Sequence, residues 1–341
     1  MIVLLRILSM LFVAGFASTA FSAGSFASRP EVHLFIAEMQ EKHGFDGNAL
    51  TLAFARVKPI PAVIKAILPP RDPSIRSWQA YRARFVESRR IGLGLDFWRE
   101  HRAVLATAQQ RTGVPEDIVV AIIGVETIYG RITGDYATLA ALATLAFDYP
   151  SPDLAVSRTR SALFRRELEE LLLLARETQR DPLSFKGSYA GALGLPQFLP
   201  GSVRRYAVDG DGDARIDLAG SPADAIASVA NFLREHGWEA DGPMTAAVDV
   251  EGGKFAALLE EGIVPGRNPS ELAAYGVTSC DAPELPVALI DLATPQQPTE
   301  YRLGYRNFYV LTRYNRSSFY AAAVLELARE LRRGYSKLNL P

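Results

Sequence analysis

The sequence has few residues of the kind that form cross-links. Its 341 residues include one cysteine, Cys280, which has no partner for a disulfide within the chain, so the fold has to be stabilised by packing. The four histidines have no ligand spacing between them, which argues against a zinc site; they are His33, His43, His101 and His236.

An excess of charge of one sign is also absent. The chain carries 37 Lys and Arg against 38 Asp and Glu, a formal net charge of −1, and its basic residues are dispersed along the sequence. A nucleic-acid-binding domain concentrates basic residues in a patch or stripe. The composition therefore excludes nucleic acid as the expected partner.

Residues 1–23 have the composition of an export signal. Arg6 is followed by an apolar run at 7–16 and then by small residues up to Ala23. The run is shorter than the roughly 20 residues that a membrane-spanning helix needs, which disfavours the alternative, an uncleaved anchor. No cysteine, the attachment residue of bacterial lipoproteins, lies near the expected cleavage region. We therefore expect a signal peptide at 1–23 and a soluble periplasmic protein.

Hydrophobic residues make up 48% of the chain, which is enough for two or three domains. Helical patterning near 30–55 and a proline-rich connector predict an N-terminal helical region at 28–75. Most of the other helical periodicity falls in a core at 76–238, with Pro115 expected at a first helical position. The helices predicted in this core span residues 97–109, 115–129, 137–146, 164–177 and 222–236.

The pattern changes after residue 238. Short alternating runs at 244–250 and 286–292, broken by many glycines and prolines, predict a small β-rich insertion at 239–303. Helical patterning returns at 318–333. Residues 304–341 are therefore expected to complete a discontinuous core.

Glu126 is the most informative single residue. On the expected helix, two isoleucines lie one turn before it, and Tyr129 and Gly130 lie one turn after it. A carboxyl group among such neighbours is partly desolvated, so its pKa should rise and it can act as a general acid near neutral pH. The alternative is a buried structural glutamate bonded to backbone or to Arg131.

A glycine-rich segment at 186–200 offers neutral hydrogen-bonding groups. Its glycines allow close backbone approach, and Ser188 and Gln197 are of the kind that hold sugar hydroxyls and amides. It is not a phosphate loop, because no Lys followed by Ser or Thr comes after its last glycine. Helix packing through small residues is the alternative.

An acidic segment starting at residue 209 matches the opening of an EF-hand calcium loop. The match is incomplete, since Ala214 replaces the glycine at position six and Gly220 replaces the glutamate at position twelve. A solvated acidic turn is the alternative. The ligands that a calcium ion would use are Asp209, Asp211, Asp213, the Arg215 carbonyl and Asp224.

Aromatic and amide side chains interleave at 307–320, just before the last expected helix. Aromatic faces stack on sugar rings, while Asn and Tyr tips hydrogen-bond to them. A strand-to-helix core segment is the alternative.

Taken in order, five segments closely resemble the bacterial lytic transglycosylase B family, also known as family 3 lytic transglycosylases. They are IIGVET at 122–127, ALATLAFDYP at 141–150, KGSYAGALGLPQF at 186–198, ASVANF with HGW at 227–232 and 236–238, and NFYVLTRYN at 307–315. The resemblance runs from about Trp78 to the C-terminus.

The resemblance implies a mainly α fold: a lysozyme-like α-helical core with an EF-hand-like loop at 209–224, an N-terminal helical region and a small β-rich insertion. The implied reaction cleaves the β-1,4 bond between N-acetylmuramic acid and N-acetylglucosamine in peptidoglycan without water, giving 1,6-anhydromuramyl ends. One glutamate serves as acid and then as base, assisted by the substrate's acetamido group. This explains why no second carboxylate stands out beside Glu126, since ordinary glycosidases use two.

By motif, Glu126 matches the family's acid and base. The positions that match substrate contacts are Tyr81, Ser188, Gln197, Asn231, Phe232, Tyr314, Asn315 and Tyr320. The resemblance implies no cofactor for catalysis and a structural Ca²⁺ at the acidic loop. The expected partners are peptidoglycan glycan strands and other cell-wall enzymes, and the protein itself is expected to be a monomer.

The sequence also departs from the family pattern. Phe232 stands where a tyrosine follows Asn231, and Ser-Pro-Asp follows Pro150 where arginines are common, with a short insertion just after it. Two other functions stay open: a hydrolytic muramidase on the same scaffold and a non-catalytic peptidoglycan-binding protein.

Overall fold

The computed structural model describes residues 24–68 and 77–338. The predicted export signal at 1–23 and part of the proline-rich connector lie outside these residues. Within the described ranges, no helix has the length and apolar character needed to cross a membrane. The described fold is mainly α-helical with small antiparallel sheets, which confirms the predicted class.

The centre of the fold is a buried helix, α7 (Glu116–Thr127). Its residues from Ile118 to Val125 are all buried, because the sequence there is apolar on every side and such a helix is stable only when it is enclosed. Near the start of this helix, the buried Asp117 accepts two hydrogen bonds from the Arg332 guanidinium, at 2.8 and 2.9 Å. The helices that enclose α7 are α5 (Ser88–Glu100), α6 (Arg102–Thr112), α11 (Pro222–Glu235) and α15 (Ser318–Leu338).

Three helix boundaries differ from those predicted around this core. The helix predicted at 97–109 is wrong, because α5 and α6 meet at a break at His101, whose φ of −107° and ψ of 21° are not helical. Pro115 is the cap before α7 and not its first residue. The helix ends at Thr127, and Tyr129 already has a left-handed backbone.

A second hydrophobic cluster joins the N-terminal helices to two helices from the middle of the chain. Phe35 and Phe54 from the N-terminal region pack in it with Leu142 and Leu168. The helix expected at 164–177 starts earlier, because Asp153 caps it by accepting hydrogen bonds from two backbone N–H groups. The elements of this cluster are η1 (Phe26–Ser28), α1 (Pro30–His43), α2 (Gly47–Ala55), α3 (Pro61–Ile67), α8 (Thr138–Phe147) and α9 (Leu154–Glu177).

A third cluster lies within the predicted β-rich insertion. Its sheet has the order β3-β7-β6, all antiparallel, with Leu289 opposite Leu303. The predicted runs at 244–250 and 286–292 contain strands, as expected. The elements are β3 (Thr245–Ala247), β4 (Asp249–Val250), α12 (Ala256–Glu260), α13 (Pro269–Leu272), η3 (Ala273–Tyr275), β5 (Val277–Thr278), β6 (Ala288–Leu292) and β7 (Glu300–Gly304).

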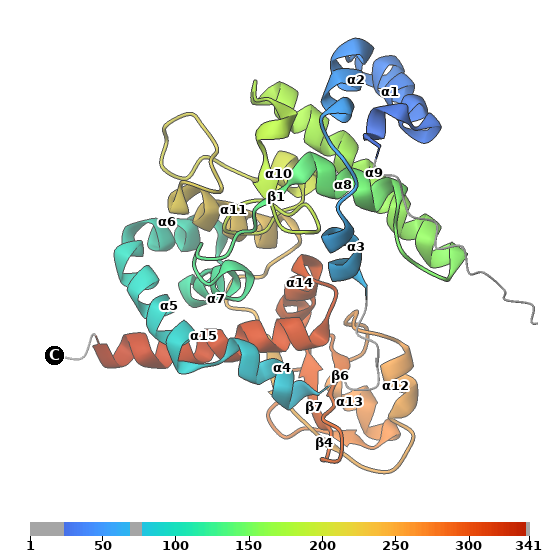
Figure 1. The fold of residues 1–341 in the computed structure, drawn as a ribbon. Helices are drawn as coiled ribbons and strands as arrows, with labels where there is room; N and C mark the ends of the chain where they lie inside the picture. Colours follow the sequence, from blue (N-terminus) through green and yellow to red (C-terminus); the bar gives the residue numbers. More distant parts are fainter. Residues whose placement is uncertain (1–23, 69–76, 339–341) are drawn as a thin grey trace, which may run out of the picture.

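The chain then returns to the core through α14 (Arg306–Tyr314) and α15, and α15 packs on α4 (Trp78–Phe85) as well as on α7. Figure 1 shows the N-terminal helices beside α8 and α9 at one end of the molecule and the insertion, in orange, at the other. The division at 75/76, 238/239 and 303/304 stays a prediction. The remaining elements are β1 (Tyr136–Ala137), η2 (Pro182–Ser184), β2 (Lys186–Gly187) and α10 (Pro200–Tyr206).

Candidate active site

Glu126 lies in the last turn of α7, where the chain bends sharply. Ile128, Tyr129 and Gly130 have φ angles of 50°, 58° and 83°. A left-handed backbone is strained for a β-branched isoleucine, and such strain is typical of functional sites. The turn brings Gly134 so close to the glycine-rich segment that a Cβ there would lie 2.4 Å from the Gly187 carbonyl oxygen.

Thr127 joins the end of α7 to the glycine-rich segment. Its buried hydroxyl donates to the Leu195 carbonyl oxygen at 3.0 Å and accepts from the Gly130 N–H at 3.0 Å. Thr127 therefore connects the turn after α7 to the glycine-rich segment, directly beside Glu126. Sequence reasoning gave this threonine no role.

The hydrogen-bond partner of Glu126 is Tyr320 from α15. The Tyr320 hydroxyl, which is buried, donates to Glu126 Oε1 at 2.6 Å. Burial raises the pKa of Glu126 from 4.5 to about 7, although the hydrogen bond from Tyr320 opposes the rise by favouring the carboxylate. The side chain keeps some contact with solvent. A substantial fraction of this carboxyl group is therefore protonated near neutral pH.

Two more of the predicted cleft tyrosines lie around this pair. The Tyr314 ring stacks on Tyr320, with centroids 6.3 Å apart and planes at 12°, and its hydroxyl donates to the Pro196 carbonyl oxygen at 2.6 Å. Tyr81 reaches the site from α4. Burial and then the nearby Glu126 charge raise the pKa of both Tyr81 and Tyr314, so all three hydroxyls stay neutral beside the carboxyl group.

Ser188 and Gln197 lie in the glycine-rich loop, to which Tyr314 is bonded through the Pro196 carbonyl oxygen. The Ser188 hydroxyl accepts a hydrogen bond from the Ala192 N–H at 3.1 Å, and no residue that the structure describes accepts its proton. The Gln197 amide nitrogen donates to the Thr133 and Gly194 carbonyl oxygens, at 3.0 and 2.9 Å. Its amide oxygen makes no hydrogen bond to any described residue. Gln197 thus holds the two loops together and presents one acceptor.

The other predicted contacts are placed differently. The Asn231 amide is occupied at both ends, because it donates to the Tyr206 carbonyl oxygen at 2.9 Å and accepts from Arg234 at 2.7 Å. Both ends of this amide are therefore engaged within the protein. Phe232 is buried against the Tyr314 ring at 4.9 Å. Asn315 is exposed at the end of α14.

Tyr129 was expected one helical turn after Glu126, and this expectation is wrong. Because α7 ends before it, its hydroxyl is buried between two helices, where a Cβ on Gly94 or Gly124 would lie within 2.4 Å of it. The sequence signal for this packing is the presence of these two glycines inside otherwise regular helices.

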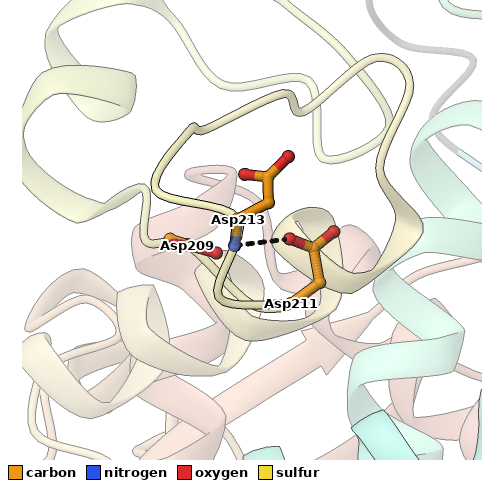
Figure 2. Close-up of side chains that lie close together, drawn as sticks. All are labelled: Asp209, Asp211 and Asp213. Atoms are coloured by element: carbon orange, nitrogen blue, oxygen red, sulfur yellow. Dashed lines mark hydrogen bonds between the residues drawn. The ribbon is translucent and has the colours of Figure 1, made fainter.

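The acidic loop precedes α11. One carboxylate oxygen from each of Asp209, Asp211 and Asp213 lies within 4.8 Å of the other two, and Figure 2 shows the three side chains on one turn of the loop. Backbone N–H groups, first that of Gly212, hold the pKa of Asp209 below its usual value. Three hard oxygen donors in this spacing suit a calcium ion.

Two details of the loop refine the predicted ligand set. Ala214, at the position where an EF-hand has glycine, has the left-handed φ of 66° that the glycine would supply. Asp224 is not part of the three-carboxylate group, since its oxygens accept from the Gly210 and Asp217 N–H groups at 2.8 and 2.6 Å. Asp224 therefore braces both sides of the loop from α11.

Comparison with known proteins agrees with this arrangement. The family model described as "Transglycosylase SLT domain" matches residues 27–329. The chain belongs to this transglycosylase family. The transglycosylase is 38% identical over 323 residues to the membrane-bound lytic murein transglycosylase B of Escherichia coli (strain K12), covering 90% of this chain and 84% of that protein. The resemblance found in the sequence is confirmed.

Solved structures extend the comparison. Soluble lytic transglycosylase SltB1 from Pseudomonas aeruginosa has a TM-score of 0.81 and 42% identity, covering 90% of this chain and 100% of its own. Escherichia coli Slt35 in complex with calcium has a TM-score of 0.78 and 36% identity, covering 92% and 96%. SltB3 from Pseudomonas aeruginosa in complex with NAG-anhNAM-pentapeptide has a TM-score of 0.72 and 30% identity, covering 89% and 79%.

The enzyme is thus a lytic murein transglycosylase that acts on peptidoglycan. One relative has been crystallised with calcium, and the three-aspartate group of this transglycosylase offers a site of the matching chemistry. Another has been crystallised with a peptidoglycan fragment.

The raised pKa of Glu126 in this transglycosylase predicts a stability effect that depends on pH. Below pH 4.5 the carboxyl group is protonated in both folded and unfolded chains, whereas above pH 7 the folded chain holds a buried carboxylate. Glu126→Gln should therefore be more stable than wild type at pH 8 by about 1–3 kcal/mol, and the difference should disappear by pH 4. Chemical denaturation at both pH values measures this.

Glu41→Gln, at an exposed position on α1, is the matched control and should show no such pH-dependent gain. Equal free energies of unfolding for wild type and Glu126→Gln at pH 8 would contradict a raised pKa.

Proposed function

We propose that Glu126 is the only acid and base with which this enzyme cleaves the β-1,4 bond between N-acetylmuramic acid and N-acetylglucosamine, leaving 1,6-anhydromuramyl ends. One observation carries the proposal. Among the described residues, the side-chain hydrogen-bond partner of the Glu126 carboxyl group is the neutral Tyr320 hydroxyl, at 2.6 Å, and no carboxylate is paired with it. A hydrolysing glycosidase places a second carboxylate across the scissile bond, to activate water or to attack C1.

With one carboxyl group, the reaction proceeds in two proton transfers. The Glu126 carboxyl donates its proton to the glycosidic oxygen, and the bond from that oxygen to C1 of the N-acetylmuramic acid breaks. The carboxylate then accepts the proton of the muramyl 6-hydroxyl as O6 bonds to C1, with the acetamido group of the same sugar stabilising C1 between the steps. Glu126 ends protonated, as it began, and no water is consumed.

The groups around Glu126 have distinct roles in this proposal. Tyr320 orients the carboxyl group and stabilises its charged form between the two steps. Tyr81 and Tyr314 exclude water and offer aromatic surface to the sugars. In this proposal the Ser188 hydroxyl and the Gln197 amide oxygen bind hydroxyl and acetamido groups of the substrate.

We also propose a structural Ca²⁺ held by Asp209, Asp211, Asp213 and the Arg215 carbonyl. The ion would neutralise the mutual repulsion of the three carboxylates and fix the loop against α11. Asp224 supports the site by holding the loop backbone and not as a ligand. The ion takes no part in the reaction.

The place of action follows from the substrate. Peptidoglycan lies outside the cytoplasm, and residues 1–23 have the composition of an export signal. We therefore propose that the enzyme acts in the periplasm as a soluble monomer on glycan strands.

The direct test is product analysis. Wild-type enzyme incubated with purified sacculi should release anhydromuropeptides, and Glu126→Gln should lower the rate by at least about 10²-fold, the usual contribution of a general acid. Mass spectrometry identifies the products, because hydrolysed ends are heavier by one water. Undiminished release by the variant would reject Glu126 as the catalyst. Products with reducing ends would show a hydrolytic muramidase, and binding without any product would show a non-catalytic protein.

A second prediction concerns Tyr320. Tyr320→Phe removes the donor that lowers the Glu126 pKa, so the pKa should rise and the alkaline limb of the pH–rate profile should move to higher pH by up to about one unit. The maximal rate should fall, because the carboxyl group loses its orientation. Tyr301→Phe, in the insertion, is the control and should leave the profile unchanged. A limb that stays in place or moves to lower pH would contradict this role.

Calcium binding predicts a thermal shift. A ligand that binds only the folded state at 100 times its Kd stabilises by about 2.7 kcal/mol, so millimolar Ca²⁺ should raise the Tm by several degrees and a chelator should reverse it. Asp211→Asn should reduce the response. Mg²⁺ should act more weakly, since it demands a tighter octahedral site. An unchanged wild-type Tm would count against the ion site.

A further inference from the structure

A buried arginine lies against the end of α7, the helix that carries Glu126. Arg90, from α5, is 7% exposed, and burial lowers the pKa of its guanidinium group. Its Nε, 4.0 Å from Glu87, makes no hydrogen bond to any residue that the structure describes. The Glu87 carboxylate instead accepts the Arg89 and Arg90 backbone N–H groups at the start of α5. A buried cation this far from a carboxylate costs stability, and such costly groups are expected mainly at functional sites.

The hydrogen bond that this guanidinium does make is to the last turn of α7. Arg90 Nη1 donates to the Gly124 carbonyl oxygen at 3.1 Å, and the same oxygen accepts the N–H of Ile128, the first residue of the left-handed turn, at 3.2 Å. A cation at the C-terminal end of a helix interacts favourably with its carbonyl groups. Gly124 is two residues before Glu126, so Arg90 is bonded to the turn that presents the carboxyl group.

The face of α5 that bears Arg90 also holds the chain after Glu126. Gly94 and Phe97 lie on this face, one and two helical turns after Arg90. The Phe97 ring centroid lies 5.5 Å from that of Tyr129, and a Cβ on Gly94 would collide with the Tyr129 hydroxyl. One face of α5 therefore fixes the backbone before Glu126 and a side chain after it.

Arg90 also contacts the aromatic pair that brings Tyr81 to the site. Its guanidinium carbon lies 5.1 Å from the centroid of the Phe85 ring, at the end of α4, and a cation near an aromatic ring is attracted to its face. Phe85 in turn packs on Tyr81, with ring centroids 5.0 Å apart. Tyr81 is close enough to Glu126 for the glutamate charge to raise its pKa, after the larger effect of burial. One buried side chain thus contacts two of the segments that form the candidate site.

We propose that Arg90 is a positioning residue, which through the Gly124 carbonyl keeps the Glu126 carboxyl group within hydrogen-bonding distance of Tyr320. The inference rests on the proposed function of Glu126. The turn at Ile128 has a strained backbone, which can relax and shift the end of α7 once this hydrogen bond is removed. A shift of about 1 Å at a reacting group can lower a rate about 10²-fold, although Arg90 itself does not touch the substrate.

The experiment compares kcat and KM for wild type, Arg90→Met and Arg90→Lys on soluble glycan strands. The assay temperature is one at which circular dichroism shows each protein fully folded. Arg90→Met should lower kcat about 10-fold or more and leave KM within about twofold, because the catalytic group is displaced while the sugar-binding residues remain. Arg90→Lys keeps the charge but loses the planar guanidinium, so its loss of kcat should be measurable but smaller.

A double variant tests the route of the effect. If Arg90 acts through the contact between Glu126 and Tyr320, combining Arg90→Met with Tyr320→Phe should lower kcat by less than the product of the two single losses. The matched control is Arg89→Met, at the exposed neighbouring position on α5, which should leave kcat and KM unchanged.

Wild-type kcat in either Arg90 variant, a loss confined to KM, or a double variant whose loss equals the product would overturn the inference. If Arg90→Met does not fold, Arg90→Lys and its combination with Tyr320→Phe decide by the same criteria. Failure of the proposed function looks different, because Glu126→Gln would then release products as fast as wild type. An inactive Glu126→Gln together with wild-type kcat in the Arg90 variants rejects the positioning role alone.

Discussion

The structure depends on the placement of one carboxyl group at the end of a helix that is apolar on every side. Because α7 is enclosed by four other helices, its last turn leads Glu126 out of the core with little water around it. Burial alone would favour the neutral acid strongly, and the hydroxyl of Tyr320 limits that effect by bonding to the charged form. The other residues of the candidate site either position Glu126 and Tyr320 or line the space beside them.

The long-range architecture supplies that partner. Tyr320 is separated from Glu126 by 194 positions, and the chain makes the whole β-rich insertion between them before α15 packs along α7. The insertion does not separate Tyr320 from Glu126 in space, because α14 and α15 return to the core after it. On the other side of Glu126, the turn after Thr127 has a strained left-handed backbone. This turn brings the chain close to the glycine-rich loop, to which Thr127 is hydrogen-bonded. The strain is tolerated because Thr127 and Gln197 bond across the two loops.

Much of this was predictable where one local pattern dominated. The apolar run of α7, the helical periodicity at 222–236 and the short run at 286–292 each predict an element that the fold contains. The break at His101 has no glycine or proline to signal it, and the exposed first turns of α9 have no periodic apolar stripe. The site was harder to predict. The order of motifs pointed to Glu126 and its tyrosines, but only the fold shows that Tyr320 bonds to it and that the Asn231 amide is already occupied.

Under the proposed mechanism, the opposing effects on the Glu126 pKa explain how one carboxyl group could act first as acid and then as base. A carboxyl group with an ordinary pKa would be ionised at neutral pH and unable to donate its proton, whereas one buried without a partner would hold its proton too tightly to become a base. Burial and a single hydrogen bond act in opposite directions and leave the pKa near 7, between these extremes. A second carboxylate nearby would raise the pKa further by repulsion and make the charged intermediate state harder to reach. The proposed two-step proton transfer therefore requires that Glu126 lie among neutral hydroxyls, and the three tyrosines meet this requirement because burial raises their own pKa values.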